Sequence, residues 1–167
     1  MSSSPSFSWI CQNPTYFLAF GFGSGLSPKA PGTWGSLAAL PLCYLMMQMP
    51  WYLHLLMTII FFLAGVYICG KTATDLKVHD HPGIVWDEFV GMMLACLFLQ
   101  DNFQTLLLVF VLFRFFDIFK PWPIQHFDKN IHGGLGIMLD DLLAGMYAWL
   151  TIYGLVTLGW ISAFAPH

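Results

Sequence analysis

Two short stretches of the sequence carry the same acidic pattern. GIVWDEFVGMM begins at residue 83 and GIMLDDLLAGM begins at residue 136, and in both a Gly-Ile pair precedes two adjacent acids and an apolar run. The acids are Asp87 and Glu88 in the first stretch and Asp140 and Asp141 in the second. Acids in the first turn of a helix are stabilised by the helix dipole, so each stretch predicts a helix that starts after a flexible glycine. If the two helices lie side by side, four carboxylates meet, and such hard oxygen ligands suit Mg²⁺. The alternative is two independent acidic helix starts.

Further charged side chains flank this pattern. Asp80 lies between His79 and His81, in a loop interrupted by Pro82, and could fold back toward the same ion. We expect each of the two histidines to be a hydrogen-bonding or interfacial residue rather than a ligand of Mg²⁺, which prefers oxygen.

A further acid, Asp117, follows Arg114 by three residues in FRFFDIFKPWPI. This spacing places both on one face of a helix. They form either an ion pair within the membrane or a metal ligand beside a phosphate-binding arginine.

A glycine-rich stretch, GFGSGLSPKAPGTWGS (residues 21–36), offers groups that could bind an anion. We do not expect it to form a regular helix, and irregular backbone near a membrane is tolerated where it lines a polar cavity. Its glycines would let backbone N–H groups close on an anion, and Lys29, Thr33 and Ser36 could add donors. The alternative is a plain connecting loop. HGGLG (residues 132–136) is similar in kind and leads to Asp140.

Acids for a metal ion, together with Arg114 and Lys120 for phosphate oxygens, describe a metal-dependent phosphoryl-transfer site. A nucleotide-binding P-loop, as in a membrane-anchored kinase, is a weaker interpretation. GVYICGKT (residues 65–72) fits the pattern GxxxxGK[ST], but that motif requires a strand, a flexible loop and a helix. Here the bulky residues 66–69 end an apolar segment instead.

The composition predicts a membrane protein with a single domain, residues 1–167. The chain is 57% hydrophobic and only 9% charged, with a mean hydropathy of +0.68. A soluble domain of this size carries about 25% charged residues. The net charge of -3 gives no basic face, so nucleic-acid binding is not expected.

Apolar segments predict helices that alternate across the membrane. No Asp, Glu, Lys or Arg occurs between Ala30 and Gly70, and one span needs only about 20 residues, so Pro50 divides this run into a hairpin. The predicted segments are about Ser36–Met49, Trp51–Gly70, Phe89–Gln100, Phe103–Phe119 and Leu142–Phe164, of which Phe89–Gln100 is short enough to be a partial span. On this path all six basic residues and eight of the nine acids fall on one side, which the positive-inside rule assigns to the cytoplasm.

Three longer blocks resemble the signature of the bacterial phosphatidylglycerophosphatase A family. They are GFGSGLSPKAPGTWGSLAALP, HDHPGIVWDEFVGM and FRFFDIFKPWPIQHFDKNIHGGLGIMLDDLLAGM, in the family's order, over about Phe20 to Tyr147. The resemblance implies an all-helical fold and Mg²⁺-dependent removal of the terminal phosphate from phosphatidylglycerophosphate at a bacterial inner membrane. The family's acidic positions correspond to Asp80, Asp87, Glu88, Asp117, Asp128, Asp140 and Asp141. Its other motif positions correspond to Thr33, Arg114, Lys120, Gly133, Gly134 and Gly136.

The sequence therefore predicts an all-α, multihelical integral membrane bundle that hydrolyses phosphatidylglycerophosphate at the cytoplasmic face. The expected Mg²⁺ ligands are Asp87, Glu88, Asp117, Asp140 and Asp141. The expected catalytic acids are Asp80, Asp87, Glu88, Asp140 and Asp141, and the expected substrate-binding residues are Thr33, Arg114, Lys120 and Gly134. Attack by water with Asp80 as general base and a covalent aspartyl-phosphate are both open. No obligate protein partner is inferred, and the alternative function is a small transporter or channel that uses intramembrane acids.

Overall fold

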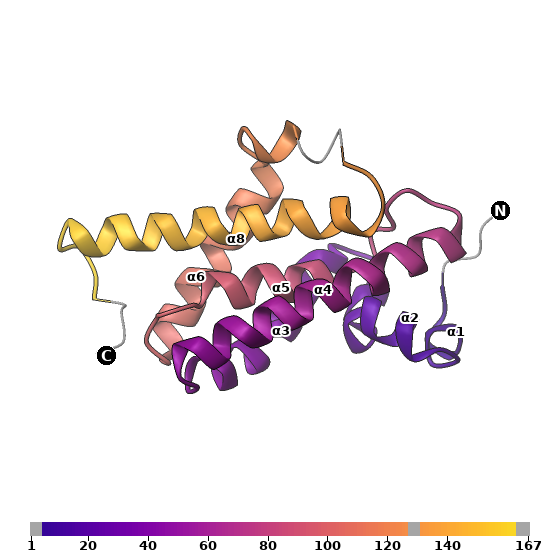
Figure 1. The fold of residues 1–167 in the computed structure, drawn as a ribbon, viewed down its shortest axis with the longest axis horizontal. Helices are drawn as coiled ribbons and strands as arrows, with labels where there is room; N and C mark the ends of the chain where they lie inside the picture. Colours follow the sequence, from indigo (N-terminus) through magenta and orange to yellow (C-terminus); the bar gives the residue numbers. More distant parts are fainter. Residues whose placement is uncertain (1–4, 127–130, 163–167) are drawn as a thin grey trace.

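Every regular element in the parts of the chain that the structure describes, residues 5–126 and 131–162, is a helix. The structure is a computed structural model, shown in Figure 1. Three short elements come first: α1 (Phe7–Ile10), α2 (Pro14–Ala19) and the 3₁₀ helix η1 (Gly21–Leu26). The longer helices are α3 (Pro31–Met47), α4 (Trp51–Leu76), α5 (Trp86–Ala95), α6 (Phe103–Phe119) and α8 (Gly133–Thr157). The predicted all-α class is confirmed.

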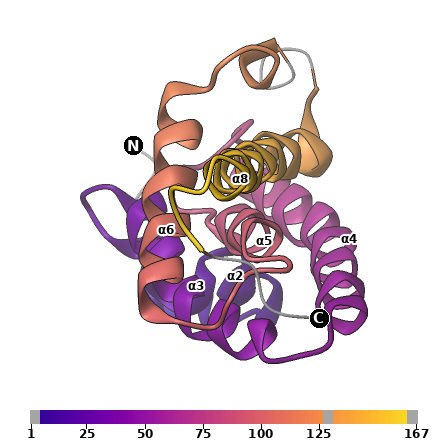
Figure 2. The same ribbon diagram turned by 90° about the vertical axis from the view of Figure 1, so that its left-hand side faces the viewer.

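Helix α5 lies at the centre of the longer helices. It packs against α3, α4, α6 and α8, and Figure 2 shows it nearly end-on between α8, α4 and α6. Leu94 is its only residue that is not buried. At about 1.5 Å per residue, its ten residues cover about 15 Å, half the thickness of a bilayer core of about 30 Å. The predicted segment Phe89–Gln100 is therefore a central helix buried in protein rather than a full span.

Helices α3 and α4 form the predicted hairpin on either side of Pro50. Proline at the first position of a helix has the required φ already fixed, and Pro31 starts α3 in this way.

Two helices, α4 and α8, are long and apolar enough to cross a membrane. Helix α6 has the bounds predicted for the fourth segment, but it crosses α5 and α8 steeply (Figures 1 and 2).

Helices α5 and α8 approach each other closely because glycine occupies both sides of their contact. A Cβ atom on Gly91 would lie 2.6 Å from the backbone oxygen of Asp141, and one on Gly145 would overlap the backbone oxygen of Gly91. Small residues at a helix contact allow the two backbones to come together. This contact holds Asp141 beside the first turn of α5. Both glycines belong to the repeated acidic stretches.

Two predictions of local structure are wrong. Helix α8 already begins at Gly133, so Asp140 and Asp141 lie about two turns inside it, and its first turn contains no acid. The glycine-rich stretch is also more regular than expected. Its first part forms η1, with left-handed φ values at Phe22 and Gly23. Residues 31–36 form the start of α3, because Pro31 favours a helix start there.

A buried carboxylate cluster as the candidate active site

Three carboxylates from the two repeated stretches meet between α5 and α8. Asp87 and Glu88 lie in the first turn of α5, where the helix dipole favours negative charge, and Asp141 lies on α8. One carboxylate oxygen from each residue lies within 4.8 Å of the other two. We call these three residues the carboxylate cluster. The structure thus brings together residues that are far apart in the sequence, as the repeated pattern indicated.

The carboxylate cluster is buried and its charges are poorly compensated. Glu88 is 8% exposed and Asp141 is 3% exposed, and like charges at such separation in a medium of low dielectric repel strongly. Asp87 Oδ1 and Glu88 Oε2 are buried and accept no hydrogen bond from any described residue. A buried polar atom without a partner destabilises a fold. An all-oxygen donor set with unpaired acceptors fits a divalent cation such as Mg²⁺.

Arg114 on α6 brings positive charge to one edge of the cluster. Its Nη1 lies 3.9 Å from Glu88 Oε1 and forms an ion pair with Asp117 Oδ2. Arg114 Nε and Nη1 are nevertheless buried without a hydrogen bond to any described residue. Asp117 is also close enough to Glu88 and Asp141 for its charge to act on both. The structure therefore shows both the predicted ion pair and the proximity of the pair to the cluster.

A glycine makes room for this arginine. A Cβ atom on Gly32, in the first turn of α3, would overlap Glu88 Oε1 and lie 3.1 Å from Arg114 Nη1. Sequence reasoning missed this role. Gly32 lies in the glycine-rich stretch, residues 21–36, but the prediction there concerned the side chain of the neighbouring Thr33. Thr33 is half-buried in the same turn, and its predicted contact with substrate stays a prediction.

Lys120 is paired with the remaining acid of the repeat. Its Nζ lies 2.6 Å from Asp140 Oδ2, while Asp140 Oδ1 accepts a hydrogen bond from the backbone N–H of Asp141 at 3.0 Å. Asp140 is buried but does not belong to the group of three carboxylates that lie within reach of one ion. The two repeats are thus unequal, because Asp87 lies within the cluster whereas its counterpart Asp140 pairs with a cation.

The loop before α5 lies near the start of α8. Asp80 is exposed and outside the cluster, although it is close enough to Asp87 for their charges to interact. His79 Nε2 and His132 Nδ1 are 2.8 Å apart, and these residues share the 53-residue spacing of the acidic repeat. His81 Nδ1 accepts a hydrogen bond from Gly83 N–H, and burial lowers the pKa of His81 although Asp80 opposes the shift. Both histidines thus form hydrogen bonds, as expected.

Glycines at the start of α8 serve close packing. A Cβ atom on Gly134 would overlap the backbone oxygen of Val66 on α4, and one on Gly136 would overlap the backbone oxygen of Ile131. The structure thus gives Gly134 a packing contact, and the predicted contact with substrate stays a prediction. Asp128, an acid of the family pattern, lies outside the described residues.

Comparison with known proteins identifies relatives over most of the chain. Residues 17–156 match the family described as Phosphatidylglycerophosphatase A. The phosphatidylglycerophosphatase A of Escherichia coli (strain K12) is 52% identical over 143 residues, which cover 85% of this chain and 83% of that protein. The Haemophilus influenzae protein of the same name is 47% identical over 145 residues, covering 86% and 89%. A Bacteroides thetaiotaomicron relative, 36% identical over 143 residues (81% and 89%), is provisionally named a phosphatidylinositol-3-phosphatase.

No solved structure matches the chain. The family match covers most of its length, and both of the more similar relatives carry the family's name. The chain therefore belongs to the phosphatidylglycerophosphatase A family of phosphatases.

Proposed function

We propose that this protein hydrolyses the terminal phosphate monoester of phosphatidylglycerophosphate in a Mg²⁺-dependent reaction. The observation that carries the proposal is that buried carboxylate oxygens and buried guanidinium nitrogens without hydrogen bonds lie close together. Asp87 Oδ1 and Glu88 Oε2 accept no hydrogen bond from a described residue, and Arg114 Nε and Nη1 donate none, although Nη1 forms an ion pair with Asp117. A cation satisfies the first set and phosphoryl oxygens satisfy the second. The names of the relatives supply the substrate.

The residues that would hold the metal are those of the carboxylate cluster, Asp87, Glu88 and Asp141. When bound, Mg²⁺ polarises a phosphoryl group and favours ionisation of a coordinated water. The close approach of α5 and α8 at Gly91 and Gly145 supports this assignment, because it allows residues of the two helices to share one ion. We assign Asp117 and Asp140 to hold Arg114 and Lys120 in place.

Arg114 and Lys120 would neutralise the oxygens of the phosphoryl group. Arginine presents a fork of N–H donors suited to phosphate, and Arg114 lies at the edge of the cluster. Asp80 would accept a proton from the attacking water, because it is exposed and close enough to interact with Asp87. Attack by a carboxylate is the other route, and it would leave an acyl phosphate that hydroxylamine traps during turnover.

The substrate's acyl chains would stay in the bilayer while its head group reaches the cluster. The length and apolar character of α4 and α8 support a multi-pass location in the bacterial inner membrane. The charge distribution along the sequence favours the cytoplasmic face for the site. A transporter or channel would distribute its acids through the membrane depth, whereas three of them here form one cluster.

Phosphate release from a panel of phospholipid monoesters tests the proposal. Purified protein in detergent should release phosphate from phosphatidylglycerophosphate with Mg²⁺, and EDTA should abolish the release. Phosphatidic acid and phosphatidylinositol 3-phosphate serve as competing substrates. Activity that is unchanged after metal removal would overturn the metal assignment, and a preference for another monoester would overturn the substrate.

Binding of the ion can be measured without turnover. Mg²⁺ should raise the Tm of the wild-type protein, since an ion that binds only the folded state stabilises it. This shift should be lost in Glu88→Gln. An equal shift in both proteins would place the ion elsewhere.

A further inference from the structure

One buried hydroxyl group lies outside the site as described above. Thr72 on α4 has no exposed surface, and its Oγ1 forms no hydrogen bond with any described residue. Ser and Thr inside a helix often donate to the carbonyl four residues earlier. The side chains that do so here, at 2.8–2.9 Å, are Ser36, Thr58, Thr74 and Thr151. The hydroxyl of Thr72 therefore differs from these in having no partner within its own helix.

The face of α4 that carries Thr72 is turned toward the carboxylate cluster. Cys69 lies three residues earlier on this buried face, and its Sγ lies 3.8 Å from Sδ of Met138, which is one turn before Asp141 on α8. Thr72 lies one helical turn further on, toward the loop that carries Asp80. Thr72 is therefore buried on the same face of α4 as Cys69, which packs against α8 one turn before Asp141.

The structure also gives a role to the residues of the stretch that fits the P-loop pattern. Residues 65–72 lie within helix α4, and the two glycines of the pattern, Gly65 and Gly70, pack against α8. A Cβ atom on Gly65 would lie 2.6 Å from Met138 Sδ, and one on Gly70 would lie 3.0 Å from the backbone nitrogen of Gly134. These contacts bring α4 close to the start of α8. Thr72, the last residue of the pattern, is left with the unpaired hydroxyl.

A buried hydroxyl without a hydrogen-bond partner destabilises the folded protein. Near a candidate binding site, such a hydroxyl indicates that a bound ligand supplies the missing partner. We propose that Thr72 Oγ1 donates a hydrogen bond to an oxygen of the phosphoryl group that is hydrolysed. The inference rests on the proposed function and adds Thr72 to the substrate-binding residues, none of which was predicted on α4.

The test removes the hydroxyl and keeps the shape of the side chain. In Thr72→Val, kcat/KM for phosphatidylglycerophosphate should fall about 10- to 100-fold, the scale of one hydrogen bond to a charged group. The Tm of the substrate-free protein should rise by a few degrees, because a methyl group replaces an unpaired polar one. Thr72→Ser should recover most of the activity. Inorganic phosphate should inhibit Thr72→Val more weakly than the wild type.

Thr58→Val is the matched control, because Thr58 is equally buried on α4 but donates to the His54 carbonyl at 2.9 Å. It should lower the Tm and leave activity unchanged. Loss of phosphate release by the wild type would overturn the proposed function itself. If the wild type is active and Thr72→Val retains at least half of its kcat/KM, only the Thr72 assignment fails. A lowered Tm in Thr72→Val would likewise overturn it, since the hydroxyl would then have a structural partner.

Discussion

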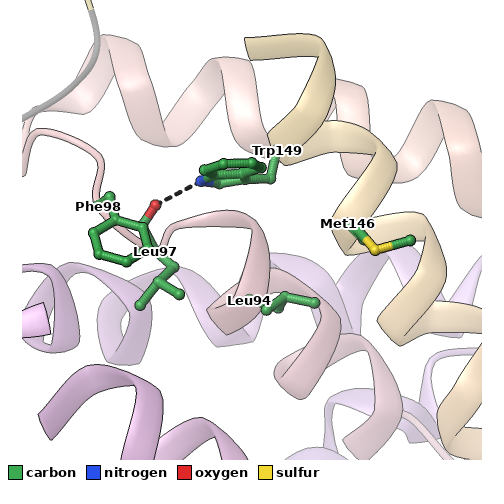
Figure 3. A pocket seen from close by; sticks show the side chains of 5 residues that line it. All are labelled: Leu94, Leu97, Phe98, Met146 and Trp149. Atoms are coloured by element: carbon green, nitrogen blue, oxygen red, sulfur yellow. Dashed lines mark hydrogen bonds between the residues drawn. The ribbon is translucent and has the colours of Figure 1, made fainter. Parts of the chain in front are cut away.

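The two ends of the contact between α5 and α8 differ in how their polar groups are satisfied. At the start of α5, the carboxylate cluster is buried with unpaired oxygens. Past the glycine contact, the same helices border a pocket of about 160 Å³ lined by Leu94, Leu97, Phe98, Met146 and Trp149 (Figure 3). The indole N–H of Trp149 donates there to the Leu97 carbonyl at 2.8 Å. Buried polar atoms thus lack hydrogen-bond partners at the end with the carboxylate cluster, whereas the indole N–H of Trp149 has its partner at the apolar end.

This difference distinguishes residues that bind a ligand, at the end with the carboxylate cluster, from residues that stabilise the fold, at the apolar end. Unpaired buried groups destabilise a protein, so a fold that tolerates several of them at one place has a ligand to satisfy them. At the apolar end the half-buried indole N–H of Trp149 already has its acceptor, the Leu97 carbonyl (Figure 3). Substitutions at the first end should therefore change activity more than stability, and substitutions at the second end should do the reverse.

The largest expected effect is at the carboxylate cluster. Asp87→Asn should lower turnover at least about 100-fold, the scale for losing a group that stabilises the transition state electrostatically. Without divalent metal its Tm should rise, because one of three repelling charges is removed. Phosphate release and thermal unfolding in EDTA measure the two effects. Asp101→Asn is the control, since Asp101 is exposed in the turn before α6, and near-normal turnover in Asp87→Asn would disprove the cluster's role.

An intermediate effect is expected at the glycine contact between the two ends. Gly91→Ala places a Cβ atom 2.6 Å from the backbone oxygen of Asp141, so α8 must move away and carry Asp141 out of the cluster. Both Tm and kcat should fall, with kcat reduced about tenfold or more, because misplacement by about 1 Å is costly for catalysis.

Gly154→Ala provides the comparison on α8. A Cβ atom there meets no atom within 4 Å, so the substitution should raise the Tm slightly through helix propensity and leave activity unchanged. Equal behaviour of the two alanine variants would show that the close approach of α5 and α8 does not position Asp141.

The contact between α5 and α8 explains which features could be predicted from the sequence and which could not. The Gly-Ile-x-x-Asp-acid repeat predicted the meeting of Asp87, Glu88 and Asp141, because residue type and spacing carry that signal. Hydropathy and Pro50 predicted the α3–α4 hairpin. The early start of α8 was missed because Gly133 and Gly134 resemble loop residues, whereas Gly134 is there to pack against Val66. The unpaired hydroxyl of Thr72 depends on which face of α4 meets α8, and a tertiary contact of this kind has no local pattern.

The smallest effect is expected at the apolar end. Trp149→Phe keeps an aromatic ring in the pocket but removes the donor to the Leu97 carbonyl. Leaving a backbone oxygen without its partner should lower stability by about 1 kcal/mol and the Tm by a few degrees, while kcat and KM for phosphatidylglycerophosphate stay at wild-type values. Thermal unfolding and steady-state kinetics on one preparation give both quantities. A loss of activity as large as that of Gly91→Ala would mean that the two ends are coupled through α8, and the division between a binding end and a structural end would then be wrong.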